Sequence, residues 1–271
     1  MRSYRANFIA AAAFVAAFAL SGTRSLADPR VADLVQAGEI RVGLFLPQYT
    51  KDPASGELRG VGAHIVSIAV ARALAERVGV ATRLAGYAAP PDVVGCLKTT
   101  RCDLGIMGID PTRAADASLS PPFIQFDFTH LVPAGSSIRS IADAHRSGVR
   151  IAVVRAHAST LALARILKGR DFIEVETPEA AFELLRDGRA DTLASSRPTL
   201  IDYAAELPGS RVLEDRYGMN LVALAIAKSQ PGRLAYISEF LDELRRSGWL
   251  QRAIDSAGLR GFEVAASQAP H

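Results

Sequence analysis

Most of the patterns that indicate a metal centre or a hydrolytic site are missing from this chain of 271 residues. It has only two cysteines, and its five histidines show no paired spacing, so no metal site is predicted. No Gly-x-Ser-x-Gly elbow, His-Glu-x-x-His motif or phosphate-binding glycine loop occurs. We therefore predict no cofactor and no catalytic residue.

Clusters of Lys and Arg interleaved with aromatic residues are also missing, which argues against a nucleic-acid partner. The formal net charge of +3 arises at the N-terminus, where Arg2, Arg5 and Arg24 occur without any acidic residue. Without residues 1–27 the net charge becomes +3 − 3 = 0. The basic character therefore belongs to the leading segment.

That leading segment has the features of a secretory signal peptide. Arginines precede an apolar run from Phe8 to Leu20, and Ser25-Leu26-Ala27 offers small residues for cleavage. The run is too short to be a good membrane span, and no later segment is longer and as apolar. Residues 1–27 are predicted to be removed on export.

Apolar runs separated by turn residues predict alternating strands and helices, which is an α/β class. Strands are expected at 40–46, 80–85 and 104–109, with helices at 62–79 and from 90 onward. Such an order favours a parallel sheet covered by helices, with ligands at the carboxyl ends of the strands.

The pattern then begins again, which predicts a second α/β unit. We expect strands at 149–154, 172–175 and 191–194 and helices at 159–167 and 177–188. A strand at 220–227 and helices at 231–248 and 249–257 complete the chain.

The end of the third predicted strand is the strongest candidate site. Asp110-Pro111 supplies an N-cap and a first-turn proline, so a helix should begin where the strand ends. Arg113 lies in the first turn of that helix, near free backbone N–H groups, which suits a carboxylate. A solvated surface arginine is the alternative.

The segment Asp-Leu-Gly-Ile-Met-Gly-Ile-Asp-Pro-Thr-Arg, followed by Ser-Pro-Pro-Phe, resembles a segment of the family 3 periplasmic solute-binding proteins, the amino-acid-type binding proteins of ABC transporters. Residues 56–60, 73–80, 148–154, 184–191 and 247–250 each resemble that family too, in order and spacing. The resemblance covers almost all of the mature chain.

This resemblance implies a two-lobed, type II periplasmic-binding-protein-like fold, in which each lobe is a mixed, mainly parallel sheet flanked by helices and two hinge strands join the lobes. The expected division is 1–27 signal peptide, 28–131 plus 223–262 lobe 1, 132–222 lobe 2 and 263–271 loose tail. The hinge strands are expected at 130–133 and 220–223.

The resemblance also implies site residues in the first lobe. Arg113 would clamp the carboxylate of a bound ligand, and Tyr49 would stack on the ligand unless it is a surface loop residue. Gly108 stands where the family often has a hydroxyl, so only its backbone could contribute. Asp110 replaces the usual threonine and is expected to cap the helix first and contact ligand second.

In the second lobe, Ala156-His157-Ala158-Ser159 takes the place of the family's helix N-terminal turn, so His157 and Ser159 are candidates, although Ser159 could simply cap the helix. Ser196 stands where the family usually has the aspartate that pairs with an ammonium. We therefore expect a carboxylate ligand without a free ammonium. Arg197 would meet a second anionic group or lie on the surface.

Because an exported protein meets an oxidising compartment, Cys96 and Cys102 are predicted to form a disulfide, with two buried thiols as the alternative. The leading functional hypothesis is a monomeric periplasmic binding protein, not an enzyme, that delivers its ligand to an inner-membrane ABC permease. A periplasmic dehydratase of the same fold and an accessory or sensory binding protein acting in trans are the alternatives.

Overall fold

The computed structural model describes residues 28–267, apart from positions 47 and 63. The predicted signal peptide and the last four residues lie outside the described residues. The helices are a 3-10 turn η1 (Pro29–Val31), α1 (Ala32–Ala37), α2 (His64–Val78), α3 (Pro90–Lys98), α4 (Pro111–Asp116), α5 (Ile141–Ala144), α6 (Ala158–Ile166), α7 (Pro178–Arg186), α8 (Arg197–Glu206), α9 (Pro231–Arg246) and α10 (Trp249–Ser256). The strands are β1 (Glu39–Phe45), β2 (Tyr49–Lys51), β3 (Leu58–Gly60), β4 (Ala81–Tyr87), β5 (Leu104–Gly108), β6 (Ser118–Leu119), β7 (Ile124–Val132), β8 (Ile151–Val154), β9 (Ile173–Val175), β10 (Thr192–Ser196), β11 (Arg211–Val212), β12 (Gly218–Ile226) and β13 (Phe262–Val264).

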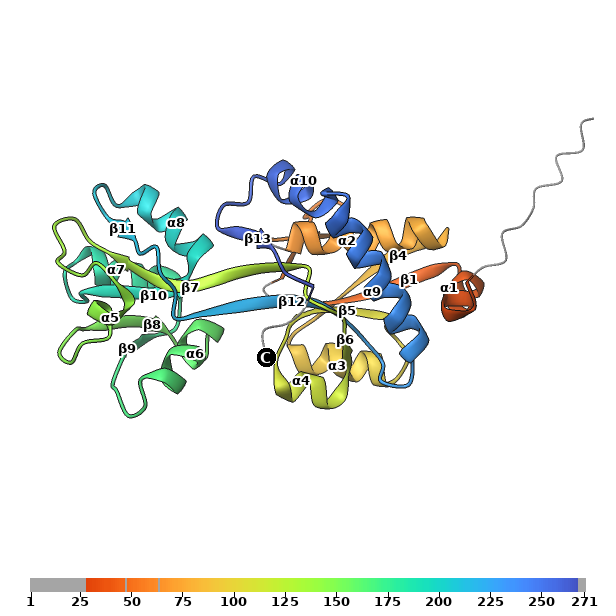
Figure 1. The fold of residues 1–271 in the computed structure, drawn as a ribbon, viewed down its shortest axis with the longest axis horizontal. Coiled ribbons are helices and arrows are strands. Elements are labelled where there is room, and N and C mark those ends of the chain that lie inside the picture. The colour runs from red at the N-terminus through yellow and green to blue at the C-terminus, as the bar shows by residue number, and fades with distance from the viewer. Residues whose placement is uncertain (1–27, 47, 63, 268–271) are drawn as a thin grey trace, which may run out of the picture.

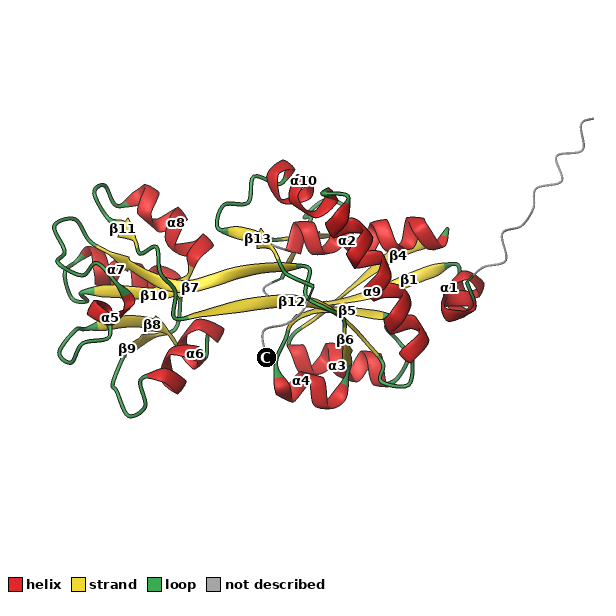
Figure 2. Ribbon diagram, in the orientation of Figure 1, coloured by secondary structure: helices red, strands yellow, loops and turns green. Residues whose placement is uncertain are grey.

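One mixed sheet runs through the molecule in the order β4-β1-β5-β12-β7-β10-β8-β9 (Figure 2). The pairs β1/β4, β1/β5, β10/β8 and β8/β9 are parallel, as the alternation of strands and helices predicts. Along this order, β12 pairs antiparallel with β5 and β7, and β10 pairs antiparallel with β7; the short strands β6, β11 and β13 add further antiparallel pairs. The α/β class is therefore confirmed.

The helices gather around two ends of this sheet, and the long strands β7 and β12 run between them (Figure 1). The larger part has a core built by β1, β5, β12, α2, α9 and α10, with Ile124 from the start of β7 and Phe123 just before it. The smaller part has its own cores, in which Leu131 packs with Ala152, Phe182 and Leu193. The chain thus buries its apolar side chains in two separate places.

β7 enters the core of the smaller part at an earlier residue than the sequence predicts. His130 and Leu131 are fully buried in the smaller part, where Leu131 pairs with Leu193 of β10. The segment 126–128 pairs instead with 218–220 of β12, between the two cores. The segment expected as a hinge strand at 130–133 thus begins within the packed smaller part, because residues 128–131 pair with 193–196 of β10.

The C-terminal segment is also more ordered than expected. Phe262–Val264 forms β13 against β7, and the Ala265 N–H donates to the Phe123 carbonyl at 3.2 Å. Arg245 donates to the Ala265 carbonyl at 2.9 Å. The prediction of a loose tail from residue 263 is therefore wrong for 263–265, because backbone pairing with β7 fixes these residues.

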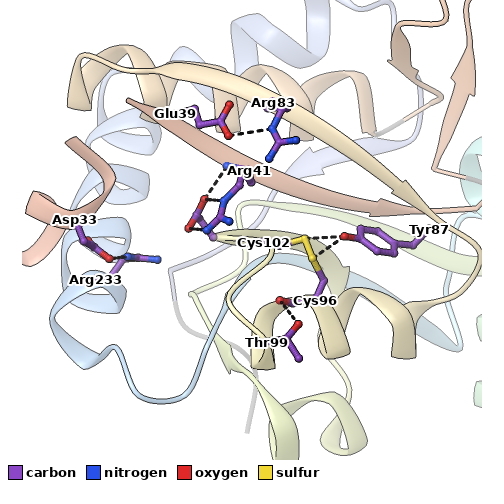
Figure 3. Close-up of polar contacts among 10 residues, drawn as sticks. Asp33, Glu39, Arg41, Arg83, Tyr87, Cys96, Thr99, Cys102 and Arg233 are labelled. Carbon is purple, nitrogen blue, oxygen red and sulfur yellow. Dashed lines mark hydrogen bonds and ion pairs between the residues drawn. A yellow bond between two sulfur atoms is a disulfide. The ribbon is translucent and has the colours of Figure 1, made fainter. Parts of the chain in front are cut away.

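The disulfide of the larger part links α3 to the start of β5 (Figure 3). Cys96 and Cys102 are bonded, with Cα atoms 5.2 Å apart, so the disulfide alternative is confirmed. The Tyr87 hydroxyl donates to the Cys96 sulfur at 2.6 Å. Beside the bond, Asp103 accepts from Arg41 through both carboxylate oxygens at 2.8 Å, which ties β5 to β1.

In the part of the chain that the structure describes, no helix combines the length and the apolar composition that a bilayer span requires.

Candidate functional site

A cavity of about 460 Å³ opens between the larger and the smaller part. This volume lies in the range of small-molecule sites. The residues that line it come from both parts: Phe45, Gln48, Val61, Gly62, His64, Gly108, Arg113, Phe126, Phe128, His157, Ala158, Ser196, Pro198, Thr199, Asp202, Asn220, Val222, Gly258, Leu259, Arg260 and Phe262. Of the sequence-predicted site residues, Gly108, Arg113, His157 and Ser196 are therefore brought together.

Arg113 is half-buried in this lining and keeps most of its hydrogen-bonding capacity. Its Nη1 donates to the Gly108 carbonyl at 2.9 Å, and its guanidinium lies 5.8 Å from the centre of the Phe45 ring. Among the described residues no carboxylate lies within ion-pair distance of it. Burial lowers the pKa of Arg113, but an arginine stays protonated at neutral pH. The cavity therefore contains a desolvated cation without an anionic partner.

One of the backbone donors expected beside Arg113, the Thr112 N–H, is taken by Asp110. Asp110 caps α4, as predicted, and accepts from the Thr112 N–H at 2.9 Å and from the Thr112 hydroxyl. These hydrogen bonds lower the pKa of Asp110, so an ionised carboxylate occupies the start of α4. Asp110 does not line the cavity, and Arg113 is the cationic side chain that this corner contributes to the lining.

Gly108 leaves room for two polar side chains. A Cβ at this position would come within 2.7 Å of the Asn220 Oδ1 and 3.4 Å of the Arg113 Nη1. A hydroxyl-bearing residue would therefore displace Asn220 or Arg113. The absence of a side chain at Gly108 lets both residues line the cavity.

His157 and Ser159 act together at the start of α6. The Ser159 N–H points at the His157 Nδ1 at 3.4 Å, and the Ser159 hydroxyl lies 2.7 Å from the same nitrogen. Since Nδ1 accepts, the hydrogen of the neutral ring is on Nε2. Burial lowers the pKa of His157, so the neutral form is favoured. Ser159 is buried and does not line the cavity; it fixes the ring that does.

Ser196 lines the cavity at the end of β10, and its hydroxyl shares a hydrogen bond of 2.7 Å with Thr199. Both hydroxyls belong to the smaller part. No acidic side chain stands at this position.

Tyr49 lies away from the cavity. Its ring covers Gly86, where a Cβ would come within 2.5 Å of the ring, and its hydroxyl lies 3.4 Å from the Tyr87 carbonyl. The ring therefore packs on β4 in the larger core rather than against a ligand. The ring fits there because Gly86, 37 positions along the chain, has no side chain.

Arg197 is also outside the lining, because its guanidinium has partners of its own. It pairs with Asp127 at 3.2 Å and donates to the carbonyls of Leu213 at 2.9 Å and Glu214 at 2.8 Å. Asp127 pairs with Arg216 as well. Arg197 thus holds the 213–215 loop to β7, and no donor of it faces the cavity.

Sequence reasoning missed the apolar wall of the cavity. Phe126 and Phe128 lie on one face of β7, as alternation requires, and Phe262 packs edge-on against Phe126 with ring centres 5.3 Å apart. Phe45 lies at the end of β1. The Phe-Asp-Phe alternation was the available signal, but which face it presents depends on pairing with β12 and β13.

The net positive charge of the lining comes from Arg113, because its other ionisable groups are paired or neutral. Asp202 and Arg260 form an exposed ion pair at 3.3 Å. Burial lowers the pKa of His64 to about 4, so this imidazole is neutral at pH 7. The described residues contain no group of three His, Cys, Asp or Glu side chains that could hold a metal ion.

Comparisons with known proteins agree with this architecture at the level of the fold. No protein-family model matches the sequence, and no curated protein matches it. Among solved structures, an ancestral cationic amino acid solute-binding protein superposes with a TM-score of 0.67 and 24% identity, covering 83% of this chain and 98% of that chain. A binding component of an ABC transporter from Wolinella succinogenes, complexed with lysine, gives a TM-score of 0.64 and 22% identity, covering 81% of this chain and 95% of that chain.

An ancestral cyclohexadienyl dehydratase is similar too, with a TM-score of 0.56 and 24% identity over 85% of this chain and 97% of that chain. The fold is therefore that of the amino-acid solute-binding proteins of ABC transporters, the family that the sequence resembles. Enzymes share it.

Proposed function

We propose that this chain is the periplasmic substrate-binding protein of an ABC importer and that it captures a small carboxylate-bearing solute, an amino acid or a related organic acid. The observation that carries the proposal is Arg113, a cation without an anionic partner among the described residues, in a cavity between two separately packed parts. A charge-assisted contact with a ligand carboxylate contributes about 1.5 to 3 kcal/mol.

In this proposal the larger and smaller parts are lobes that close on the ligand by bending at β7 and β12. Support comes from the two strands that join cores on either side of the cavity. Hinge closure of this kind buries the ligand and presents a new surface. An inner-membrane permease would recognise that closed form of the monomer.

A thermal-shift screen of residues 28–271 against carboxylates, amino acids and neutral polar solutes tests the proposal. The protein is unfolded and refolded first, to remove carried ligand. A ligand at about 100 times its Kd adds roughly 2.7 kcal/mol, which raises the Tm of a protein of this size by several degrees. Arg113→Met should abolish the shift. A folded protein that responds to no carboxylate would contradict the proposal.

Small-angle scattering tests the closure itself. The radius of gyration should fall when the screened ligand saturates the protein, because the two lobes approach each other. An unchanged scattering curve with ligand bound would contradict hinge closure without contradicting binding.

A dehydratase of the same fold is the second candidate, and the similarity to an ancestral cyclohexadienyl dehydratase favours it. Such chemistry needs a general acid or base in the cavity, and His157 and His64 line it in neutral form. Turnover of a cyclohexadienyl carboxylate, followed by absorbance of the aromatic product, would favour the enzyme. Binding without turnover would favour transport.

A further inference from the structure

The charge of the cavity lining limits the charge of its ligand. Arg113 contributes one positive charge, the Asp202–Arg260 pair cancels, and the two lining histidines are neutral at pH 7. A ligand that becomes buried should balance what surrounds it, because an unpaired buried charge is costly. The lining therefore suits a ligand with a net charge of −1, whereas an α-amino acid with an uncharged side chain has a net charge of zero.

An ammonium group would find no free carboxylate in this lining. Asp110 and Asp127 are half-buried carboxylates close in sequence to lining residues. Neither lines the cavity, and each already has partners. Asp202 lines it but is exposed and paired with Arg260. At the end of β10, the Ser196 and Thr199 hydroxyls hydrogen-bond to each other. Burying an ammonium here would remove its water without replacing it by an anion.

His157 contributes a neutral imidazole to the cavity lining. Because Ser159 directs an N–H at the Nδ1, the other ring nitrogen carries the hydrogen, and His157 lines the cavity. A neutral N–H donor pairs with an oxygen acceptor, such as a carbonyl or hydroxyl oxygen, and repels an ammonium. The smaller part thus favours an acceptor.

The wall of the cavity is aromatic. Phe126 lies edge-on to Phe128 and to Phe262, with ring centres 6.1 Å and 5.3 Å apart. Phe45 and Val222 extend the apolar lining. Aromatic pairs of this geometry favour a further aromatic or branched apolar group against their faces and edges.

Building on the proposed function, we propose that the site selects a monocarboxylate with an aromatic or branched apolar body and a neutral oxygen acceptor beside the carboxylate, the chemistry of a 2-hydroxy or 2-oxo acid. Arg113 holds the carboxylate, His157 donates to the neighbouring oxygen, and the phenylalanines contact the body. The α-amino acid of the same shape is rejected.

Isothermal titration of the refolded protein with matched pairs tests this selection. The first pair is 3-phenyllactate and phenylalanine, and the second is 2-hydroxy-4-methylpentanoate and leucine; within each pair only hydroxyl and ammonium differ. The hydroxy acid of at least one pair should bind about tenfold or more tightly than its amino acid, since a buried donor or charge without a partner is costly. An amino acid that binds as tightly as its hydroxy acid overturns the inference.

Variants at His157 and Ser196 should change the preference between matched ligands, which a purely structural role would leave unchanged. His157→Phe should weaken phenyllactate but not 3-phenylpropanoate, which lacks the oxygen, and His157→Gln should restore phenyllactate binding through its amide N–H. Ser196→Asp adds a carboxylate to the lining and should shift the preference toward phenylalanine. Equal loss of phenyllactate and phenylpropanoate in His157→Phe overturns the role of His157.

The outcomes separate the two proposals. Phenylalanine binding that requires Arg113 and is as tight as phenyllactate binding leaves the proposed function in place and overturns this inference. No binding of any carboxylate by a cooperatively folded protein overturns both.

Discussion

Two junctions between a strand and a helix face the same cavity, one in each part of the molecule, and each carries an arginine. At the end of β5, Arg113 meets a single backbone carbonyl and lines the cavity. At the end of β10, Arg197 is held by Asp127 and by three carbonyls of the 213–215 loop. In both helices the arginine is close to a proline at the first turn.

The difference shows that a local sequence pattern does not decide whether an arginine is free to bind a ligand or is held by other residues of the protein. Asp127 is 70 positions from Arg197 along the chain, and only the pairing of β7 with β10 brings it near. An arginine becomes available to a ligand when the fold brings no anion to it. The larger part therefore contributes the charge of the site, and the smaller part contributes neutral donors.

Each part contains a histidine that burial keeps neutral, His64 in the larger and His130 in the smaller, and the acid response of His130 is the largest effect expected. His130 of the smaller part is fully buried, with its Nδ1 3.2 Å from the Thr192 hydroxyl and its Nε2 3.2 Å from the His145 Nε2. Burial lowers the pKa of His130 to about 3, with the neighbouring His145 and Arg170 adding to the shift.

Because the unfolded chain protonates its histidines near pH 6.5 and the folded chain does not, stability falls as the pH falls below 6.5. The loss approaches about 1.4 kcal/mol per pH unit for such a group and comes to about 2.3 kcal/mol between pH 6.5 and 4.5. Urea unfolding at these pH values measures it, and His130→Gln should show a smaller loss. Equal slopes in both proteins would contradict this account of His130.

The disulfide braces only the larger part. Replacing both cysteines by serine opens a loop with a sequence separation of 6 and should lower the free energy of unfolding by about 2 kcal/mol, through the entropy of the unfolded chain. Hydrogen exchange should accelerate in α3 and β5 more than in β8 and β10. Protection lost equally from both parts would mean that the parts unfold as one unit.

Arg197→Met should lower the free energy of unfolding by about 1 to 2 kcal/mol, since three carbonyls lose a charged donor and Asp127 keeps only Arg216. Ligand affinity should stay the same, because Arg197 does not line the cavity. Chemical unfolding and titration on the same preparation measure both. A loss of affinity with unchanged stability would assign Arg197 to the site.

Local signals in the sequence predict much of this fold. The prolines at 111 and 178 start helices where expected, and the apolar runs give the parallel strands of both parts. Asp110 caps its helix as predicted. These features depend on neighbouring residues, which the sequence displays directly.

Features that depend on distant pairing were not predictable in the same way. Tyr49 packs on Gly86 instead of the cavity, and β13 reaches back to β7 from the end of the chain. The aromatic wall needs Phe45, Phe128 and Phe262 together, and these lie on three separate strands. The role of Ser159 in fixing the His157 ring likewise depends on the direction of one N–H.

The most direct test of the account is a comparison of Kd values for the best carboxylate from the screen, measured by isothermal titration on the wild-type protein, Arg113→Met and Arg197→Met. The account predicts that Arg113→Met weakens binding roughly 10- to 150-fold, the effect of losing a charge-assisted contact of about 1.5 to 3 kcal/mol, whereas Arg197→Met binds as the wild type does. Wild-type affinity in Arg113→Met, or an equal loss in both variants, would contradict it.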